Sequence, residues 1–122
     1  MPSSHTCRIL VVDDHVAIRE TMRQVLEDEG CRVVTAGNGA EALAWLRSGE
    51  SLPCLIFVDL MMPVMDGFEF RRRQLRESAL ASIPLVFVTA MDDPDQMDVE
   101  VLRKPFRIEQ VLAVVRRACP GS

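Results

Sequence analysis

The stretch LIFVDLMMPVMDG, residues 55–67, runs four apolar side chains into one aspartate and then into a loop with proline and glycine. A short apolar run bounded by turn-forming residues is typical of a strand buried on both faces. Asp59 therefore comes at the end of a predicted buried strand. A carboxylate is costly to bury without a partner, so this aspartate points to a chemical role.

Similar apolar runs predict four more strands, at residues 9–12, 32–35, 85–88 and 99–102. Several of the runs are continuously apolar instead of alternating, which is how strands read when helices cover both faces of a parallel sheet. Between the runs lie segments of helical character. A repeated strand-helix order with short connections predicts an open, doubly wound α/β domain.

The sequence pattern predicts some of the helices between the strands more strongly than others. Apolar residues within 18–26 and 108–115 recur at three- and four-residue spacing and form one stripe on each helix, and residues 40–46 are strong helix formers. The third helix leaves its register open, because Phe68 and Leu75 are seven residues apart but arginines fall where apolar residues are expected.

Arg71, Arg72 and Arg73 interrupt the apolar pattern of the third helix. We expect them on its solvated side, with Glu69 and Arg73 forming an ion pair one turn apart. A net charge of −4 argues against a nucleic-acid surface, which needs an excess of basic residues.

A length of 122 residues with 48% hydrophobic content suits one domain, residues 1–122, with a core of about 7–118. The last helix runs to about Ala118, and we expect no output domain after it. No apolar run approaches the roughly 20 residues that a membrane helix needs, and no secretion signal is apparent. We expect a cytoplasmic protein without membrane contact.

The four cysteines, Cys7, Cys31, Cys54 and Cys119, are scattered without a Cys-x-x-Cys pair. Three of them lie in or beside apolar segments. We therefore expect buried or half-buried reduced thiols, as in a cytosolic protein.

Polar residues follow the predicted strands, at the edge of the sheet where function collects in open α/β folds. They are Asp13, Asp14, Asp59, Thr89 and Lys104. Three neighbouring carboxylates repel one another unless a cation lies among them. Oxygen ligands with no histidine or cysteine nearby favour a hard divalent ion such as Mg²⁺. Mg²⁺ and a neighbouring lysine commonly stabilise the negative charge of a phosphoryl group during its transfer. A carboxylate can be the nucleophile that accepts the group.

The order of these motifs resembles the receiver domain of two-component response regulators. The motifs are Asp13-Asp14, Asp59 followed by Met-Met-Pro-x-Met-Asp-Gly, Val88-Thr89-Ala90 and Lys104-Pro105-Phe106, and they span nearly the whole chain. The resemblance implies a flavodoxin-like fold with a five-stranded parallel sheet of order 2-1-3-4-5. It also implies a signalling domain that is no enzyme beyond its own phosphorylation and dephosphorylation.

Carried to this sequence, the resemblance implies that Asp59 accepts a phosphoryl group from a histidine kinase or a histidine phosphotransfer protein. Asp14 and Asp59 would bind Mg²⁺ directly, with Mn²⁺ as a possible substitute. Asp13 would bind the ion through water, and the backbone carbonyl of Met61 would complete the set. The output would pass to a downstream protein target.

The remaining positions of the resemblance concern the response to phosphorylation. Lys104 would pair with the phosphoryl oxygens, and the Thr89 hydroxyl would hydrogen-bond them. Pro105 matches a position where the family usually has a cis peptide bond. The added negative charge next to Lys104 and Thr89 would bias the surface toward a second conformation.

Each site residue also has a plainer interpretation. Asp14 would serve as a helix N-cap, Thr89 would bond backbone at a strand end, and Lys104 would be a solvated surface charge. Met61, Met62 and Met65 are interpreted as loop packing. His15 lies close enough to tune the acidic pocket, but a solvent-facing position is favoured.

Two features depart from the family pattern. Only residues 89–98 connect the fourth and fifth predicted strands, so the helix there must be shortened, for example over Pro94–Asp98, or irregular. Val101 stands where the family typically has a tyrosine or phenylalanine that moves with the threonine. These departures keep an alternative open, a receiver-like interaction module whose output is independent of phosphorylation. A metal-dependent phosphatase or a small nucleotide-binding enzyme is a more distant alternative. Residues 37–39 do not form a phosphate-cradling loop, because they lack its spacing.

Overall fold

The computed structural model describes residues 7–49, 52–90 and 99–119 of the chain. Five parallel strands form one sheet in the order β2-β1-β3-β4-β5. Their bounds are β1 Arg8–Val12, β2 Arg32–Ala36, β3 Leu55–Asp59, β4 Leu85–Thr89 and β5 Val101–Arg103. The predicted α/β fold with strand order 2-1-3-4-5 is therefore confirmed.

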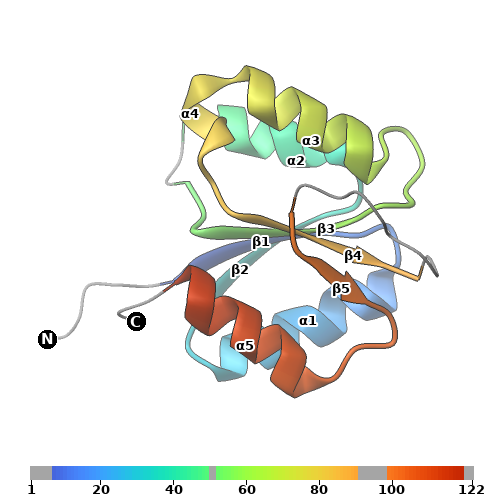
Figure 1. The fold of residues 1–122 in the computed structure, drawn as a ribbon, viewed down its shortest axis with the longest axis vertical. Helices are drawn as coiled ribbons and strands as arrows, with labels where there is room; N and C mark the ends of the chain where they lie inside the picture. Colours follow the sequence, from blue (N-terminus) through green and yellow to red (C-terminus); the bar gives the residue numbers. More distant parts are fainter. Residues whose placement is uncertain (1–6, 50–51, 91–98, 120–122) are drawn as a thin grey trace, which may run out of the picture.

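Helices cover both faces of this sheet (Figure 1). Their bounds are α1 Val16–Asp28, α2 Gly39–Arg47, α3 Gly67–Arg76, α4 Ser78–Ala81 and α5 Ile108–Ala118. Helices α1 and α5 lie on one face, and α2, α3 and α4 lie on the other. No helix in the described ranges is long and apolar enough to cross a membrane.

The two faces of the sheet bury two separate apolar clusters, and β3 contributes to both. Leu55 and Phe57 pack in the cluster under α1 and α5, whereas Ile56 and Val58 pack in the cluster under α2 and α3. Alternate residues of a strand point to opposite faces, so a strand covered on both sides must be apolar throughout. This explains the continuous run before Asp59.

Helix α3 resolves the register that the sequence left open. Phe70 and Gln74 are fully buried, while Phe68 is 39% exposed and Leu75 48% exposed. The Gln74 side-chain amide donates to the carbonyl oxygens of Leu80 (3.0 Å) and Ile83 (2.9 Å). A polar residue can occupy this core position because it satisfies backbone groups where the chain turns.

The arginines of α3 divide between the surface and the core edge. Arg72 and Arg73 are exposed, and the expected Glu69–Arg73 ion pair is present, with Arg73 Nε 2.8 Å from Glu69 Oε2. Arg71 is half-buried instead of solvated, because its guanidinium donates to Gln74 Oε1 at 2.8 Å. The expectation for Arg71 was therefore wrong.

Two further elements differ from expectation. The short helix α4 between α3 and β4 was not predicted, and its Leu80 is buried. Strand β5 starts at Val101 instead of residue 99, because its ladder with β4 begins with Val101 opposite Phe87. The shortened helix expected over Pro94–Asp98 lies outside the described residues.

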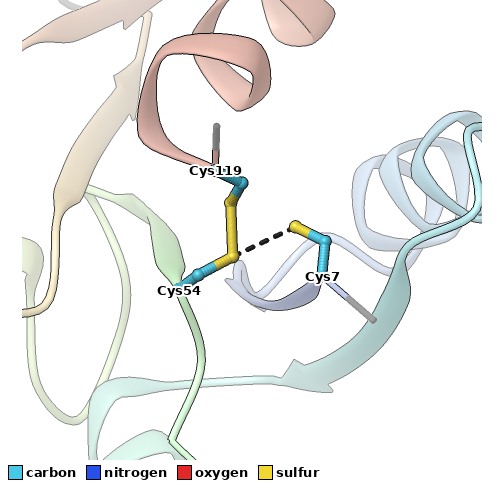
Figure 2. The surroundings of a disulfide bond; sticks show 3 residues. All are labelled: Cys7, Cys54 and Cys119. Carbon is cyan, nitrogen blue, oxygen red and sulfur yellow. Dashed lines mark hydrogen bonds between the residues drawn. A yellow bond between two sulfur atoms is a disulfide. The ribbon is translucent and has the colours of Figure 1, made fainter. Parts of the chain in front are cut away.

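The expectation of four reduced thiols was wrong, because Cys54 and Cys119 form a disulfide (Figure 2). Their burial was predicted correctly: Cys7, Cys31 and Cys119 are buried and Cys54 is half-buried. The physical reason is the chain path. Cys54 directly precedes β3, and α5 runs back so that its end, at Cys119, reaches the same edge of the sheet. Residues 65 positions apart thus become neighbours.

Candidate functional site

The carboxyl ends of the strands bring the polar side chains together. Asp59 is the last residue of β3, and Asp13 directly follows the neighbouring strand β1. Lys104 directly follows β5, and its backbone N–H donates to the carbonyl oxygen of Thr89 at 2.8 Å. Parallel strands end at one edge, so residues distant in sequence converge there.

Lys104 points into this acidic edge and is not a solvated surface charge. Its Nζ lies 3.1 Å from Asp13 Oδ2 and 3.2 Å from Asp59 Oδ2. The Lys104 side chain is 14% exposed, and the two carboxylate side chains are 3% and 4% exposed. The following peptide bond, Lys104–Pro105, is cis, as the resemblance implied. A half-buried ammonium therefore bridges two buried carboxylates.

Asp14 does not cap the helix that follows it. His15 is the N-cap residue of α1, and it makes no side-chain capping hydrogen bond. Asp14 Oδ1 is buried and accepts no hydrogen bond from the described part of the chain, although His15 Nδ1 lies 3.3 Å away. A buried carboxylate oxygen without a hydrogen-bond donor is costly unless a cation satisfies it.

The donor set around Asp14 fits a divalent cation. Asp13, Asp14, His15 and Asp59 each offer a ligand atom, and these atoms lie within 4.8 Å of one another. Carboxylate oxygens are the ligands that hard cations such as Mg²⁺ prefer. The acidic pocket, defined here as Asp13, Asp14 and Asp59, can therefore hold such an ion.

Asp13 is fixed by its own neighbours. Its Oδ1 accepts from the His15 backbone N–H at 2.8 Å, and Arg19 donates from its guanidinium to the Asp13 carbonyl oxygen at 2.8 Å. His15 is 60% exposed, yet its Nδ1 lies 3.1 Å from Asp13 Oδ1. The exposed position expected for His15 is therefore compatible with contact to the pocket. Sequence reasoning missed Arg19, because an arginine on the first turns of a surface helix carries no special signal.

Asp59 is held by a turn of the loop after β3. Its Oδ1 accepts from the backbone N–H of Met61 at 3.1 Å. Burial raises the pKa of Asp59, and the charge of Asp13 raises it further, whereas the Met61 N–H and Lys104 lower it. Burial is the largest of these effects. The ionised form of Asp59 is thus destabilised in the folded protein without metal.

Replacing Asp59 with asparagine is expected to stabilise the metal-free protein at pH 7.5 by about 1 kcal/mol. Substitutions that remove an unfavourable charge from a functional site often stabilise the fold by such an amount. A carboxyl group whose pKa is raised by folding favours the folded state at low pH, and this contribution is lost as pH rises above its ordinary value of 3.8 and through the raised value. Asparagine cannot ionise and avoids that loss. Urea unfolding with a chelator should show the gain at pH 7.5 and a smaller gain near pH 4.5. Asp28→Asn, at the exposed end of α1, should show no such difference; an equal gain in both variants would contradict the explanation.

The other residues singled out in the sequence lie beside the pocket. Thr89 ends β4 and is fully buried, next to the end of β3 in the sheet. Met61 is 65% exposed, which contradicts its interpretation as loop packing, whereas Met62 is buried and Met65 is partly buried. Met65 packs against the cluster under α2 and α3.

The fold and the acidic pocket define the class of protein. The model of the response regulator receiver domain family matches residues 9–116 of the 122-residue chain. The chain belongs to this family, whose members act in two-component signalling.

Individual relatives cover different parts of their own length. The chain is 32% identical to the protein PilG of Pseudomonas aeruginosa, over 93% of this chain and 88% of that protein. It is 39% identical to the response regulator MprA of Mycobacterium ulcerans, over 89% of this chain but only 48% of that protein. Among solved structures, the chemotaxis response regulator CheY4 of Vibrio cholerae has a TM-score of 0.84 at 31% identity, covering 93% of this chain and 99% of that one. The chain thus spans most of PilG and about half of MprA.

Proposed function

We propose that this chain is a phosphoacceptor that receives a phosphoryl group on Asp59 from a phosphohistidine of a partner protein. The observation that carries this proposal is the environment of Asp59: a buried carboxylate at a strand end, 3.2 Å from the Lys104 ammonium and beside an Asp14 oxygen without a hydrogen-bond donor. A transferring phosphoryl group needs positive charge beside its oxygens. Lys104 would supply one such charge, and a cation bound at Asp14 would supply the second.

In the transfer, an oxygen of the Asp59 carboxylate forms a bond to phosphorus while the phosphorus–nitrogen bond to histidine breaks. The histidine nitrogen keeps the electron pair, and the ring leaves as a neutral imidazole because its other nitrogen carries a proton. Lys104 stabilises the negative charge of the phosphoryl oxygens, and the Thr89 hydroxyl donates to one of them after transfer. The domain catalyses only this step and its own dephosphorylation.

The same proposal assigns the metal ligands. Asp14 and Asp59 would hold Mg²⁺ directly, Asp13 through a water molecule, and Met61 through its backbone carbonyl; Mn²⁺ can replace Mg²⁺ at such a site. When bound, the ion neutralises charge on the phosphoryl oxygens. The Met61 turn keeps Asp59 Oδ1 oriented before a partner arrives.

A protein partner is supported by exposed apolar residues that follow the strand ends around the pocket. Val16 is 60% exposed, Val64 81% and Phe68 39%. We propose that a histidine kinase or histidine phosphotransfer protein docks there and that a second protein reads the output. We place these reactions in the cytoplasm, within one domain with a core of about 7–118, and without direct binding to nucleic acid or membrane.

The output differs from an aromatic switch, because Val101 on β5 has no ring to move. Val101 is half-buried and packs against the cluster under α2 and α3. This residue favours the second candidate, an interaction module that signals without phosphorylation. The two candidates differ in one measurable property, the covalent state of Asp59.

The test is the intact mass of the protein after incubation with acetyl phosphate, with Mg²⁺ and with a chelator. We expect one added phosphoryl group with Mg²⁺, a large reduction with the chelator and none in Asp59→Asn. Asp28→Asn should behave as the unmodified protein. Folded protein that takes up no phosphoryl group in the presence of Mg²⁺ would overturn the proposal and favour the phosphorylation-independent module.

A further inference from the structure

The edge of the sheet opposite the acidic pocket gathers all four cysteines. Cys7 directly precedes β1, Cys31 precedes β2 and Cys54 precedes β3, while Cys119 directly follows α5. Strands β2, β1 and β3 are neighbours in the sheet, so the residues before them lie side by side. A five-residue strand spans roughly 17 Å, which separates this edge from the acidic pocket.

Three of the sulfur atoms converge at one place (Figure 2). Cys54 Sγ is bonded to Cys119 Sγ, and Cys7 Sγ lies 3.0 Å from Cys54 Sγ. The sulfur atoms of Cys7, Cys54 and Cys119 all lie within 4.8 Å of one another. They come from three different elements, so the fold itself holds the group together, and the group is named the cysteine triad below.

The sulfur atoms of the triad are largely shielded from water. Cys7 is 8% exposed and Cys119 is 7% exposed, with Cys54 half-buried. Buried thiolates are costly without a positive charge beside them, and a soft cation supplies that charge.

We propose that the reduced cysteine triad, Cys7, Cys54 and Cys119, binds a thiophilic metal ion, with Zn²⁺ as the best match. Three thiolates at one place are typical zinc ligands, with a Zn–S distance of about 2.3 Å. Zn²⁺ accepts the fourth ligand from water. The acidic pocket offers carboxylate oxygens, with the His15 imidazole beside them, so the two sites differ in metal preference.

The disulfide and the metal-bound form are alternative states of the same sulfur atoms. A dithiol reductant transfers two electrons to the Cys54–Cys119 bond and is itself oxidised to a disulfide, which leaves three thiols in the triad. Zn²⁺ then displaces three protons as three sulfur–metal bonds form. The proposed cytoplasmic setting decides only whether the disulfide or the metal-bound form prevails, because that compartment keeps thiols reduced. The inference rests on the proposed function in this one respect.

The consequence of metal binding would be a tie between the sheet and the last helix. The ligands would link the start of β1, the start of β3 and the end of α5. Helix α5 begins at Ile108, three residues after Pro105 of the Lys104–Pro105 segment beside the acidic pocket. The metal would thus fix the far end of the helix whose near end adjoins the proposed phosphorylation site.

The test uses Cd²⁺ as a probe, because cadmium–thiolate bonds absorb in the ultraviolet and cadmium–carboxylate bonds do not. Full-length protein is reduced with a phosphine, freed of reductant without oxygen and titrated with Cd²⁺. We expect the absorption to saturate at one equivalent, to disappear on adding excess Zn²⁺ and to be absent in the oxidised protein. Reduced, folded protein without this absorption would overturn the proposal.

Variants identify the ligands. Cys54→Ser and Cys119→Ser should each weaken Zn²⁺ binding by more than about 100-fold, beyond the effect of removing an outer-shell partner. Cys31→Ser is the control for a contact outside the ligand set, because Cys31 is also buried at this edge and contacts Cys7 but lies outside the triad; its loss should be clearly smaller. Equal losses in all three variants would contradict the triad. The result is independent of acetyl phosphate labelling, so failure here leaves the proposed function intact, and failure there leaves the zinc site intact.

Discussion

Replacing Lys104 with methionine is expected to lower the free energy of unfolding of the metal-free protein at pH 7 by about 3 kcal/mol, because it leaves buried carboxylates without their cation. Asp13 and Asp59 are 3% and 4% exposed, and Lys104 Nζ is within 3.2 Å of both. Water has little access to replace the lost ammonium. Methionine retains much of the lysine stem, so the loss reports charge more than packing.

The cause of this loss can be separated from simple damage to the fold. Adding Asp59→Asn to Lys104→Met removes one of the two unpaired charges and should recover at least half of the lost stability. Acidification to pH 5 should also reduce the loss, because a proton then takes over part of the role of the ammonium. Urea unfolding with a chelator measures the free energy of unfolding of Lys104→Met, of the double variant and of Lys104→Met at pH 5.

The control for Lys104→Met removes a positive charge elsewhere. Arg76→Met acts at the exposed end of α3 and should change stability by no more than about 0.5 kcal/mol. If both variants lost the same small amount, Lys104 would be an ordinary surface charge, and the acidic pocket would have to be stable without it.

The main features of the fold could be read from the sequence because burial on two faces leaves a strong local pattern. Residues 55–58 are continuously apolar since alternate side chains enter different clusters. The order of the strands came from the family resemblance, because periodicity alone does not say which strands are neighbours. The position of Asp59 at a strand end could also be read locally. The parallel sheet then places Asp59 next to Asp13 and Lys104, because all three follow or end strands at the same edge.

The sequence failed where a polar residue occupies a core position. Gln74 is fully buried because it satisfies the carbonyl oxygens of Leu80 and Ile83, which are six and nine residues away. No apolar pattern marks such a residue. The same contact anchors the turn that contains α4, a helix too short to show its own periodicity.

The cysteines were misjudged because only their mutual spacing and the apolar character of their surroundings were considered. The absence of a Cys-x-x-Cys pair says nothing about residues that the fold brings together. A usable signal was present, since Cys7 comes two residues and Cys54 one residue before a predicted apolar run. Strand starts of a parallel sheet share an edge, as strand ends do, and applying that rule would have placed Cys7 beside Cys54. It would not have found Cys119, which follows the last helix.

Changing Gly67 to alanine is expected to slow phosphorylation of Asp59 by about 100-fold, as small misplacements of reacting groups do. Gly67 is the first residue of α3 and is buried against the end of β3, where its N–H donates to the Leu60 carbonyl oxygen at 2.9 Å. A Cβ atom at this position would lie 2.8 Å from the Asp59 carbonyl oxygen and 2.8 Å from Leu60 Cα. Both contacts are with backbone, so the end of β3 or the whole of α3 must shift.

Gly39→Ala is the matched control for that change. Gly39 is also buried and is also the first residue of a helix, α2, so helix preference is the same in the two variants. A Cβ atom there meets only the Met65 side chain, with Sδ at 2.9 Å, Cγ at 3.1 Å and Cβ at 3.2 Å. The flexible outer part of the side chain can rotate away, and the Cβ contact needs only a small shift. Rates of acetyl phosphate labelling and urea unfolding should show a slow and less stable Gly67→Ala protein, destabilised by about 2 kcal/mol through overpacking, beside a nearly normal Gly39→Ala protein. If Gly67→Ala lost stability but kept its labelling rate, the strain would be relieved by movement of α3 alone, and the position of Asp59 would depend on β3 and not on the helix packed against it.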